Sequence, residues 1–190
     1  TLEIKVENRH RQPVVGLQEE NFYLTENKRP VNKVKFLGAA SNNTFADITL
    51  IIDRSDTSNL YKNEIETAVK EIAASMNDSG TLRVISAGAM PVTEYIGKPI
   101  GVENFTLDTL KNPVTKNVAI DLALRLATND LITAEKKRSI ILISGGDTKD
   151  YSYSKYNLAE LTSYMNNNSV GFSFIQVIQN AVSSEMDYII

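Results

Sequence analysis

Residues 48–58 read Ile48-Thr49-Leu50-Ile51-Ile52-Asp53-Arg54-Ser55-Asp56-Thr57-Ser58. The first five form an almost continuous apolar run, which is typical of a strand buried on both faces of a parallel sheet. The run ends abruptly in carboxylates and hydroxyls. Open α/β sheets place their binding sites at the C-terminal ends of such strands. This one stretch therefore predicts an α/β sheet that carries a polar loop at its C-terminal edge.

The sequence after this run alternates between predicted strands and predicted helices. Strands are indicated by β-branched or apolar runs at residues 82–86, 92–96, 140–143 and 170–178, the second of them as a short edge strand. Apolar side chains at helical spacing indicate amphipathic helices at residues 60–76, 118–127 and 158–165. This alternation predicts a doubly wound, mainly parallel sheet that is flanked by helices.

The N-terminal part of the sequence has a different pattern. It contains short strand-like segments, among them residues 34–37, separated by turns such as residues 26–30, and it ends in a small polar stretch at residues 39–44. We predict a small β-rich unit with its linker over residues 1–46 and the main domain over residues 47–190. Residues 183–190 resemble the first turns of a helix, so we expect the domain to continue past Ile190.

Composition excludes several classes of protein. The sequence has no Cys, which excludes a disulfide scaffold and a Cys-ligated metal. The net charge of −3 gives no reason to expect a nucleic-acid partner. No apolar stretch approaches the roughly 20 residues that a membrane span needs, so we expect no direct insertion into a membrane. The single His, His10, lies in a polar turn, which disfavours a Ser-His-Asp catalytic arrangement.

A second polar loop follows the buried strand at residues 140–143. It reads Ser144-Gly145-Gly146-Asp147-Thr148-Lys149-Asp150. In a parallel sheet this loop emerges at the same edge as the loop that follows Ile52. Carboxylates and hydroxyls gathered there suit a hard divalent cation such as Mg²⁺, which prefers oxygen ligands.

The spacing Asp53-x-Ser55-x-Thr57 after a buried strand resembles the start of the metal-ion-dependent adhesion site (MIDAS) of von Willebrand factor type A domains, in particular bacterial members. Other stretches are similar to the helix after the family's Thr-bearing loop, the strand before its distal Asp and the small β unit that precedes some members. These are residues 118–124, 138–145, and 13–17 with 21–22. The resemblance implies a non-enzymatic protein-binding or adhesion module, which we expect to be extracytoplasmic. Because the sequence starts at Thr1 with no initiator Met, we also expect it to be part of a larger multidomain protein.

The resemblance also assigns a metal site, with departures from the family pattern. Asp53, Ser55 and Thr57 match ligand positions, whereas the family's loop Thr aligns with Val114 and leaves Thr115 one position away. The family's distal Asp falls at Gly145, and Asp147 is a candidate to compensate. We therefore expect a degenerate site with weak or absent binding of Mg²⁺, Mn²⁺ or Ca²⁺. In the alternative interpretation these residues are simply helix N-caps.

Two other functions compete with the binding module. In the first alternative, the domain is a metal-independent structural scaffold of a larger assembly. In the second alternative, it is a phosphotransfer enzyme similar to haloacid dehalogenases. The second alternative is weakened because Ser55 stands where that family needs an Asp as general acid and base. Tyr residues after the second loop are candidates for a partner-binding patch, with ordinary packing on the following helix as the alternative; they are Tyr151, Tyr153 and Tyr156.

Overall fold

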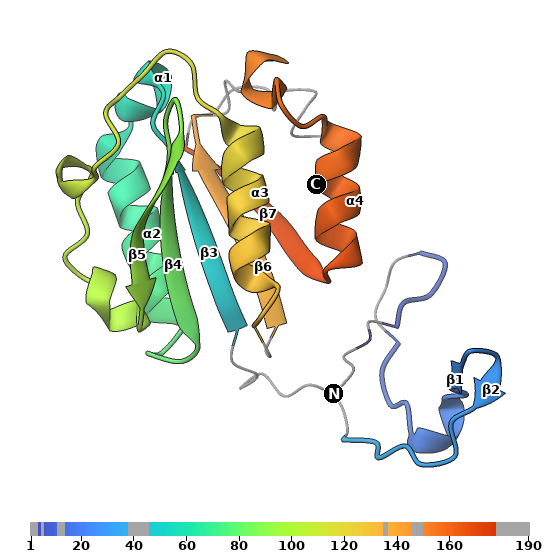
Figure 1. Cartoon of the computed structure of the whole chain (residues 1–190). Coiled ribbons are helices and arrows are strands. Elements are labelled where there is room, and N and C mark those ends of the chain that lie inside the picture. Colours follow the sequence, from blue (N-terminus) through green and yellow to red (C-terminus); the bar gives the residue numbers. More distant parts are fainter. Residues whose placement is uncertain are drawn as a thin grey trace. The chain divides into compact units, whose positions relative to one another are not determined.

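The computed structural model describes residues 4, 6–10, 14–37, 46–134, 137–145 and 150–177 (Figure 1). Contacts between Cα atoms divide the chain into two compact units, Thr1–Thr44 and Phe45–Ile190.

The N-terminal unit contains a short 3₁₀-helix, η1 (Glu19–Asn21), and an antiparallel hairpin of two short strands, β1 (Thr25–Glu26) and β2 (Arg29–Pro30). Its turn residues Asn27 and Lys28 both have positive φ, as the tight turns of hairpins require. The strand predicted at residues 34–37 is not formed. None of the described residues between 4 and 37 is buried, so the apolar alternation there has no core to face.

A five-stranded sheet forms the centre of the second unit. The strands are β3 (Ala46–Asp53), β4 (Thr81–Ala87), β5 (Pro91–Gly97), β6 (Lys137–Ser144) and β7 (Val170–Gln176). Their order is β5-β4-β3-β6-β7, and only β5, at one edge, runs antiparallel to its neighbour. The mainly parallel sheet, with residues 48–52 at its centre, is therefore confirmed.

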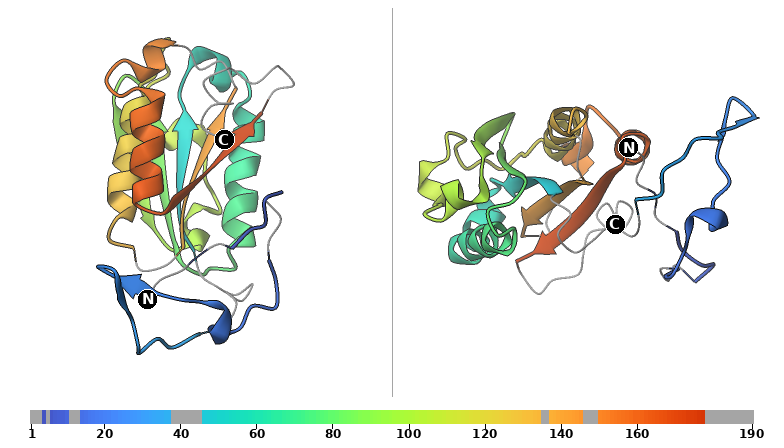
Figure 2. Two further views of the ribbon diagram at one scale, coloured as in Figure 1. Left: turned by 90° about the vertical axis from the view of Figure 1, so that its right-hand side faces the viewer. Right: turned by 90° about the horizontal axis from the view of Figure 1, so that it is seen from below.

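Helices cover both faces of this sheet. The helix α2 (Lys62–Ser75) lies on one face, and α3 (Ile120–Leu131) and α4 (Leu158–Asn167) lie on the other (Figure 2). Short helical segments are found in the loops: α1 (Asp56–Asn59), η2 (Pro99–Val102), η3 (Leu107–Thr109) and η4 (Asp150–Tyr153). The doubly wound α/β architecture is thus confirmed. None of the described helices is long and apolar enough to cross a membrane.

Side chains on the two faces of the central strand, β3, pack in two separate hydrophobic clusters. Ile51 packs in the cluster with α3 and α4, whereas Leu50 and Ile52 pack in the cluster with α2. All three side chains are fully buried. Burial of each contributes about 1.5–3 kcal/mol, so β3 is held from both sides. This packing fixes the position of Asp53, the last residue of the strand.

Candidate functional site

The loops that leave β3 and β4 meet a third segment at the C-terminal edge of the sheet. The Arg54 N–H donates to the Ala87 carbonyl (2.9 Å), at the end of β4. The Thr115 N–H donates to the Arg54 carbonyl (2.9 Å), and the Asp56 N–H donates to the Thr115 carbonyl (3.2 Å). Thr115 thereby forms an isolated parallel bridge with Ser55. Main-chain hydrogen bonds alone therefore join the loop after β3 to the end of β4 and to the segment that carries Thr115.

Asp53 is the centre of a hydrogen-bond network at this edge, and only 2% of its surface is exposed. Its Oδ1 accepts the N–H of Ser55 (2.7 Å). Its Oδ2 accepts the hydroxyls of Ser144 (2.6 Å), Ser58 (2.7 Å) and Ser55 (3.1 Å). Hydrogen bonds to a carboxylate are stronger than those between neutral groups. The buried negative charge is thus solvated by the protein itself.

Two of these hydroxyls also accept hydrogen bonds. The Ser55 Oγ caps α1 by accepting the N–H of Ser58 (3.1 Å). The Ser58 Oγ accepts the N–H of Gly145 (2.7 Å), the residue that follows β6. The cluster therefore joins the end of β3, the first turn of α1 and the end of β6. We call Asp53, Ser55, Ser58, Ser144 and the Gly145 N–H the Asp53 network.

Only some of the predicted ligand residues lie in the Asp53 network. Asp53 and Ser55 lie in the Asp53 network, whereas Thr57 is half-buried and is not among the described donors to Asp53. Thr115 adjoins Ser55 through its main chain, and its hydroxyl accepts the Asn117 N–H (3.4 Å). Asp147 lies outside the described residues.

Sequence reasoning missed Ser58, which contacts the carboxylate of Asp53. The available signal was its place three residues after Ser55, where the backbone N–H of a helix's first turn meets its N-cap side chain. That spacing predicts the bond from the Ser58 N–H to the Ser55 Oγ. It does not predict the bond from the Ser58 hydroxyl to Asp53, because that bond depends on how α1 leaves the strand.

A buried cation stands beside the Asp53 network. Arg54 is 7% exposed, and its Nε donates to the Asn112 carbonyl (3.2 Å). Burial lowers the pKa of Arg54 from its ordinary value, while the negative charges of Glu94, Asp108 and Asp53 act in the opposite direction. An Arg stays protonated at neutral pH even so. The edge therefore already holds a positive charge near the carboxylate of Asp53.

A second polar cluster holds the neighbouring loops. The Asn112 side chain donates to the carbonyls of Ser86 (2.8 Å) and Met90 (2.7 Å). The carboxylate of Glu94 accepts the Ser86 hydroxyl (2.5 Å) and the N–H groups of Lys111 (3.0 Å) and Asn112 (3.3 Å). These bonds tie the turn between β4 and β5 to the segment that leads to Thr115. Hydrogen bonds, one of them fully buried, therefore also fix the loops next to the Asp53 network.

The described residues do not fit a dedicated divalent-cation site. Among them there is no group of three or more His, Cys, Asp or Glu that could hold a metal ion. The Asp53 network contains one carboxylate, and both of its oxygens already accept hydrogen bonds. A cation bound there would have to displace hydroxyl donors and sit near the Arg54 guanidinium. This donor set lacks the negative charge that normally holds Mg²⁺ or Ca²⁺.

The candidate Tyr residues lie on the side of α3 and α4. Tyr153 and Tyr156 are half-buried and pack against the hydrophobic cluster on that face. The Tyr156 ring also lies 5.4 Å from the Cζ of Arg125. The side chain of Tyr151 lies outside the described part of the chain. Packing therefore accounts for much of the surface of Tyr153 and Tyr156, and their role in binding stays a prediction.

No protein-family model and no curated protein matches the sequence. Solved structures do match. Proximal thread matrix protein 1 from the mussel byssus, in a structure with a zinc-occupied MIDAS motif, is 16% identical with a TM-score of 0.58, and the match covers 77% of this chain and 39% of that one. The VWA domain of SpRpn10 is 14% identical with a TM-score of 0.54, covering 76% of this chain and 82% of that one.

A third match is an aerotolerance-related membrane protein from Bacteroides fragilis, 13% identical with a TM-score of 0.52, covering 68% of this chain and 66% of that one. At these identities the likeness concerns the fold. The matched fold agrees with the mainly parallel sheet and the helices on both of its faces. The chain has the α/β fold of von Willebrand factor type A domains.

Proposed function

We propose that this chain is a non-enzymatic protein-binding module that engages its partner at the C-terminal edge of the sheet. The observation that carries the proposal is a pair of exposed apolar side chains at that edge. Leu60, between α1 and α2, is 79% exposed, and Met90, in the turn between β4 and β5, is 63% exposed. Exposed apolar anchors surrounded by polar groups are the usual centres of protein interfaces.

The surroundings of these two side chains support a preformed contact surface. The loop that bears Leu60 begins at the Asp53 network, and the turn that bears Met90 is tied to Asn112 through the Met90 carbonyl. Little main-chain order would have to be gained on binding, which lowers the entropic cost of association.

We further propose that this contact does not require a divalent cation. The carboxylate of Asp53 is satisfied by hydroxyls, and Arg54 supplies a resident positive charge. Zinc in the mussel protein belongs to that protein's own motif. A partner of this chain would therefore contribute apolar contacts rather than an acidic side chain that completes a metal's coordination.

Several features argue for binding rather than catalysis. The unit that carries this edge contains no His, because the only His of the sequence, His10, belongs to the N-terminal unit. Ser55, at the position of a dehalogenase general acid, is committed to Asp53 and to the N-terminus of α1. Its hydroxyl proton is therefore already engaged by the carboxylate of Asp53. We place the module in an extracytoplasmic, multidomain protein, since the matched structures include a byssal thread protein and a bacterial membrane protein.

Site-specific photocrosslinking tests this proposal. p-Benzoylphenylalanine replaces Leu60, Met90 or, as the control, Ile100. Ile100 is 59% exposed but follows β5 at the opposite edge of the sheet. On irradiation in extract of the source organism, we expect one discrete protein adduct from positions 60 and 90, unaffected by EDTA, and none from position 100.

Other outcomes of this experiment discriminate between the alternatives. An adduct that disappears with EDTA would show that a metal is required. Equal adducts from positions 60, 90 and 100 would contradict a specific edge contact. The absence of any adduct would favour the scaffold alternative, in which this edge is not a binding surface.

A further inference from the structure

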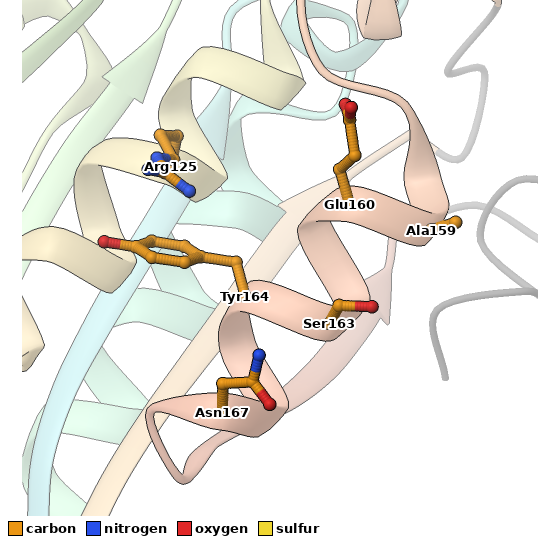
Figure 3. Close-up of a pocket in the computed structure, with 6 residues that line it drawn as sticks. All are labelled: Arg125, Ala159, Glu160, Ser163, Tyr164 and Asn167. Atoms are coloured by element: carbon orange, nitrogen blue, oxygen red, sulfur yellow. The ribbon is translucent and has the colours of Figure 1, made fainter.

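On the face of the sheet covered by α3 and α4, the guanidinium of one Arg lies over two Tyr rings. The Cζ of Arg125, on α3, lies 3.4 Å from the centroid of the Tyr164 ring on α4 and 5.4 Å from that of Tyr156. Figure 3 shows the guanidinium beside the face of the Tyr164 ring. Such a cation–π contact fixes the plane of the guanidinium and leaves the N–H groups at its rim free to point outward.

The two rings are held in place by residues one helical turn on either side of Arg125. Asp121, which is almost fully buried, accepts the N–H groups of Lys155 (2.7 Å) and Tyr156 (3.1 Å). Asn129 accepts the hydroxyl of Tyr164 through its Oδ1. The stack is therefore positioned by α3 itself, and its geometry does not depend on a ligand.

The donors of this guanidinium have no acceptor within the described part of the chain. No hydrogen bond or ion pair joins Arg125 to any residue there. Glu160 lines the same shallow hollow, but its Oε2 accepts the Asn157 N–H (3.1 Å) in the capping box of α4. The Glu160 side chain extends away from the stacked pair in Figure 3. Among the described residues, this half-buried cation therefore has no acidic partner.

The shape of the hollow agrees with an incoming side chain. Its lining on α4 includes Ala159 and Ser163, two small residues one helical turn apart, next to Tyr164. Small side chains on a helix surface allow a partner segment to approach closely. Arg125 lines the same hollow, so an acidic side chain that enters the hollow can reach its guanidinium.

We propose that the α3–α4 face is a second protein-docking surface, on which Arg125 receives a carboxylate side chain of an acidic partner segment. A planar guanidinium offers parallel N–H donors that match the two oxygens of a carboxylate. This surface is distinct from the C-terminal edge and does not depend on the contact proposed there.

Nitrogen-15 NMR of the whole chain tests the proposal with a blocked hexaglutamate peptide as the probe. We expect saturable shifts of the Arg125 Nε–Hε signal and of the Ser163 and Tyr164 amides. Arg125→Gln should weaken binding by about tenfold or more, the scale of a charge-assisted hydrogen bond. The matched control is Lys70→Gln, which removes the same charge from α2, where Lys70 is half-buried like Arg125. Because α2 covers the opposite face of the sheet, this variant should change affinity less than about twofold.

Two further variants separate recognition from folding. Tyr164→Phe keeps the ring and loses the hydroxyl bond to Asn129 that helps to position it, so it should weaken binding less than Arg125→Gln does. Arg125→Lys keeps the charge without the planar donors and should bind less tightly than the wild type. Unchanged amide spectra away from α3 and α4 would show that these variants fold normally.

Several results would overturn the proposal. Equal losses from Arg125→Gln and Lys70→Gln would indicate attraction by net charge alone. Shifts that persist in Arg125→Gln would place the peptide elsewhere, and no shift at Arg125 would show that the stack does not bind carboxylates. Equal shifts with inorganic phosphate at matched charge would show a general anion site rather than one for an acidic protein segment.

Discussion

Replacing Ser58 by Ala tests whether the Asp53 network holds the C-terminal edge together. The Ser58 side chain is fully buried, donates to the Asp53 Oδ2 (2.7 Å) and accepts the Gly145 N–H (2.7 Å). The substitution removes a hydrogen bond to a charged group, worth about 1.5–3 kcal/mol, and leaves a buried N–H unsatisfied, which costs about 1–3 kcal/mol. Because the two losses are not fully additive, we expect the free energy of unfolding to fall by about 2–4 kcal/mol.

The matched control for this substitution is Ser152→Ala. Ser152 is also fully buried, but its Oγ has no hydrogen-bond partner in the described part of the chain. Removing that hydroxyl relieves an unsatisfied group, so the free energy of unfolding should stay the same or rise slightly. Thermal unfolding followed by circular dichroism should show a fall in Tm of roughly 4–16 °C for Ser58→Ala, at about 2–4 °C per kcal/mol for a domain of this size.

Equal falls in Tm for both variants would refute this reasoning, because the loss would then reflect the change in volume rather than the hydrogen bonds. An unchanged Tm for Ser58→Ala would show that the network does not stabilise the fold. The scans are repeated with added Mg²⁺. If Mg²⁺ restored the Tm of Ser58→Ala, a cation would be replacing the missing donor to Asp53, and the metal-independent interpretation would be wrong.

Three further predictions concern metal binding, catalysis and the pH dependence of stability. Calorimetric titration with Mg²⁺ or Mn²⁺ should give weak or no binding, and tight binding that needs both Asp53 and Asp147 would instead support a functional adhesion site. No hydrolysis of p-nitrophenyl phosphate is expected, and turnover abolished by Asp53→Asn would contradict this. Burial raises the pKa of Asp130 above its ordinary value of 3.8, against the attraction of Arg83, so its charged form destabilises the fold as pH rises. Asp130→Asn should therefore raise Tm at pH 7 but not below the ordinary pKa, and an equal gain at both pH values would exclude this cause.

The fold was predictable because its strongest signals are local. The apolar run before Asp53 is buried on both faces, and its position at the centre of the sheet follows from that burial. The mixed burial of residues 91–97 likewise agrees with the edge strand expected near residues 92–96. By contrast, the pattern at residues 34–37 indicated a strand where none forms. Periodicity reports which residues could face a core, but not whether a core is present.

The details of the candidate site were less predictable because they depend on contacts between distant residues. The bond from Ser144 to Asp53 spans 91 positions of the sequence, and the bond from Gly145 to Ser58 spans 87. A motif placed Asp53 and Ser55 at the right edge, but it could not show that a different hydroxyl would take a place beside the carboxylate. The stack around Arg125 is equally non-local, since its two Tyr rings come from the segment that leads into α4 and from α4 itself.

The two proposed surfaces require partners of different chemistry, and the reason lies in how each charge is satisfied. The carboxylate of Asp53 is hydrogen-bonded by hydroxyls inside the protein. The C-terminal edge presents the exposed side chains of Leu60 and Met90, so binding there gains free energy mainly from apolar burial. The positive charge of Arg125 is stacked on a Tyr ring but has no acidic partner in the part of the chain that the structure describes, so the α3–α4 face gains from an incoming carboxylate. Apolar contacts are little affected by salt, whereas an ion pair near the surface is screened over about 8 Å at physiological ionic strength. Raising the salt concentration should therefore weaken contacts at the α3–α4 face while those at the edge persist, so one domain can hold two partners whose binding responds differently to ionic conditions.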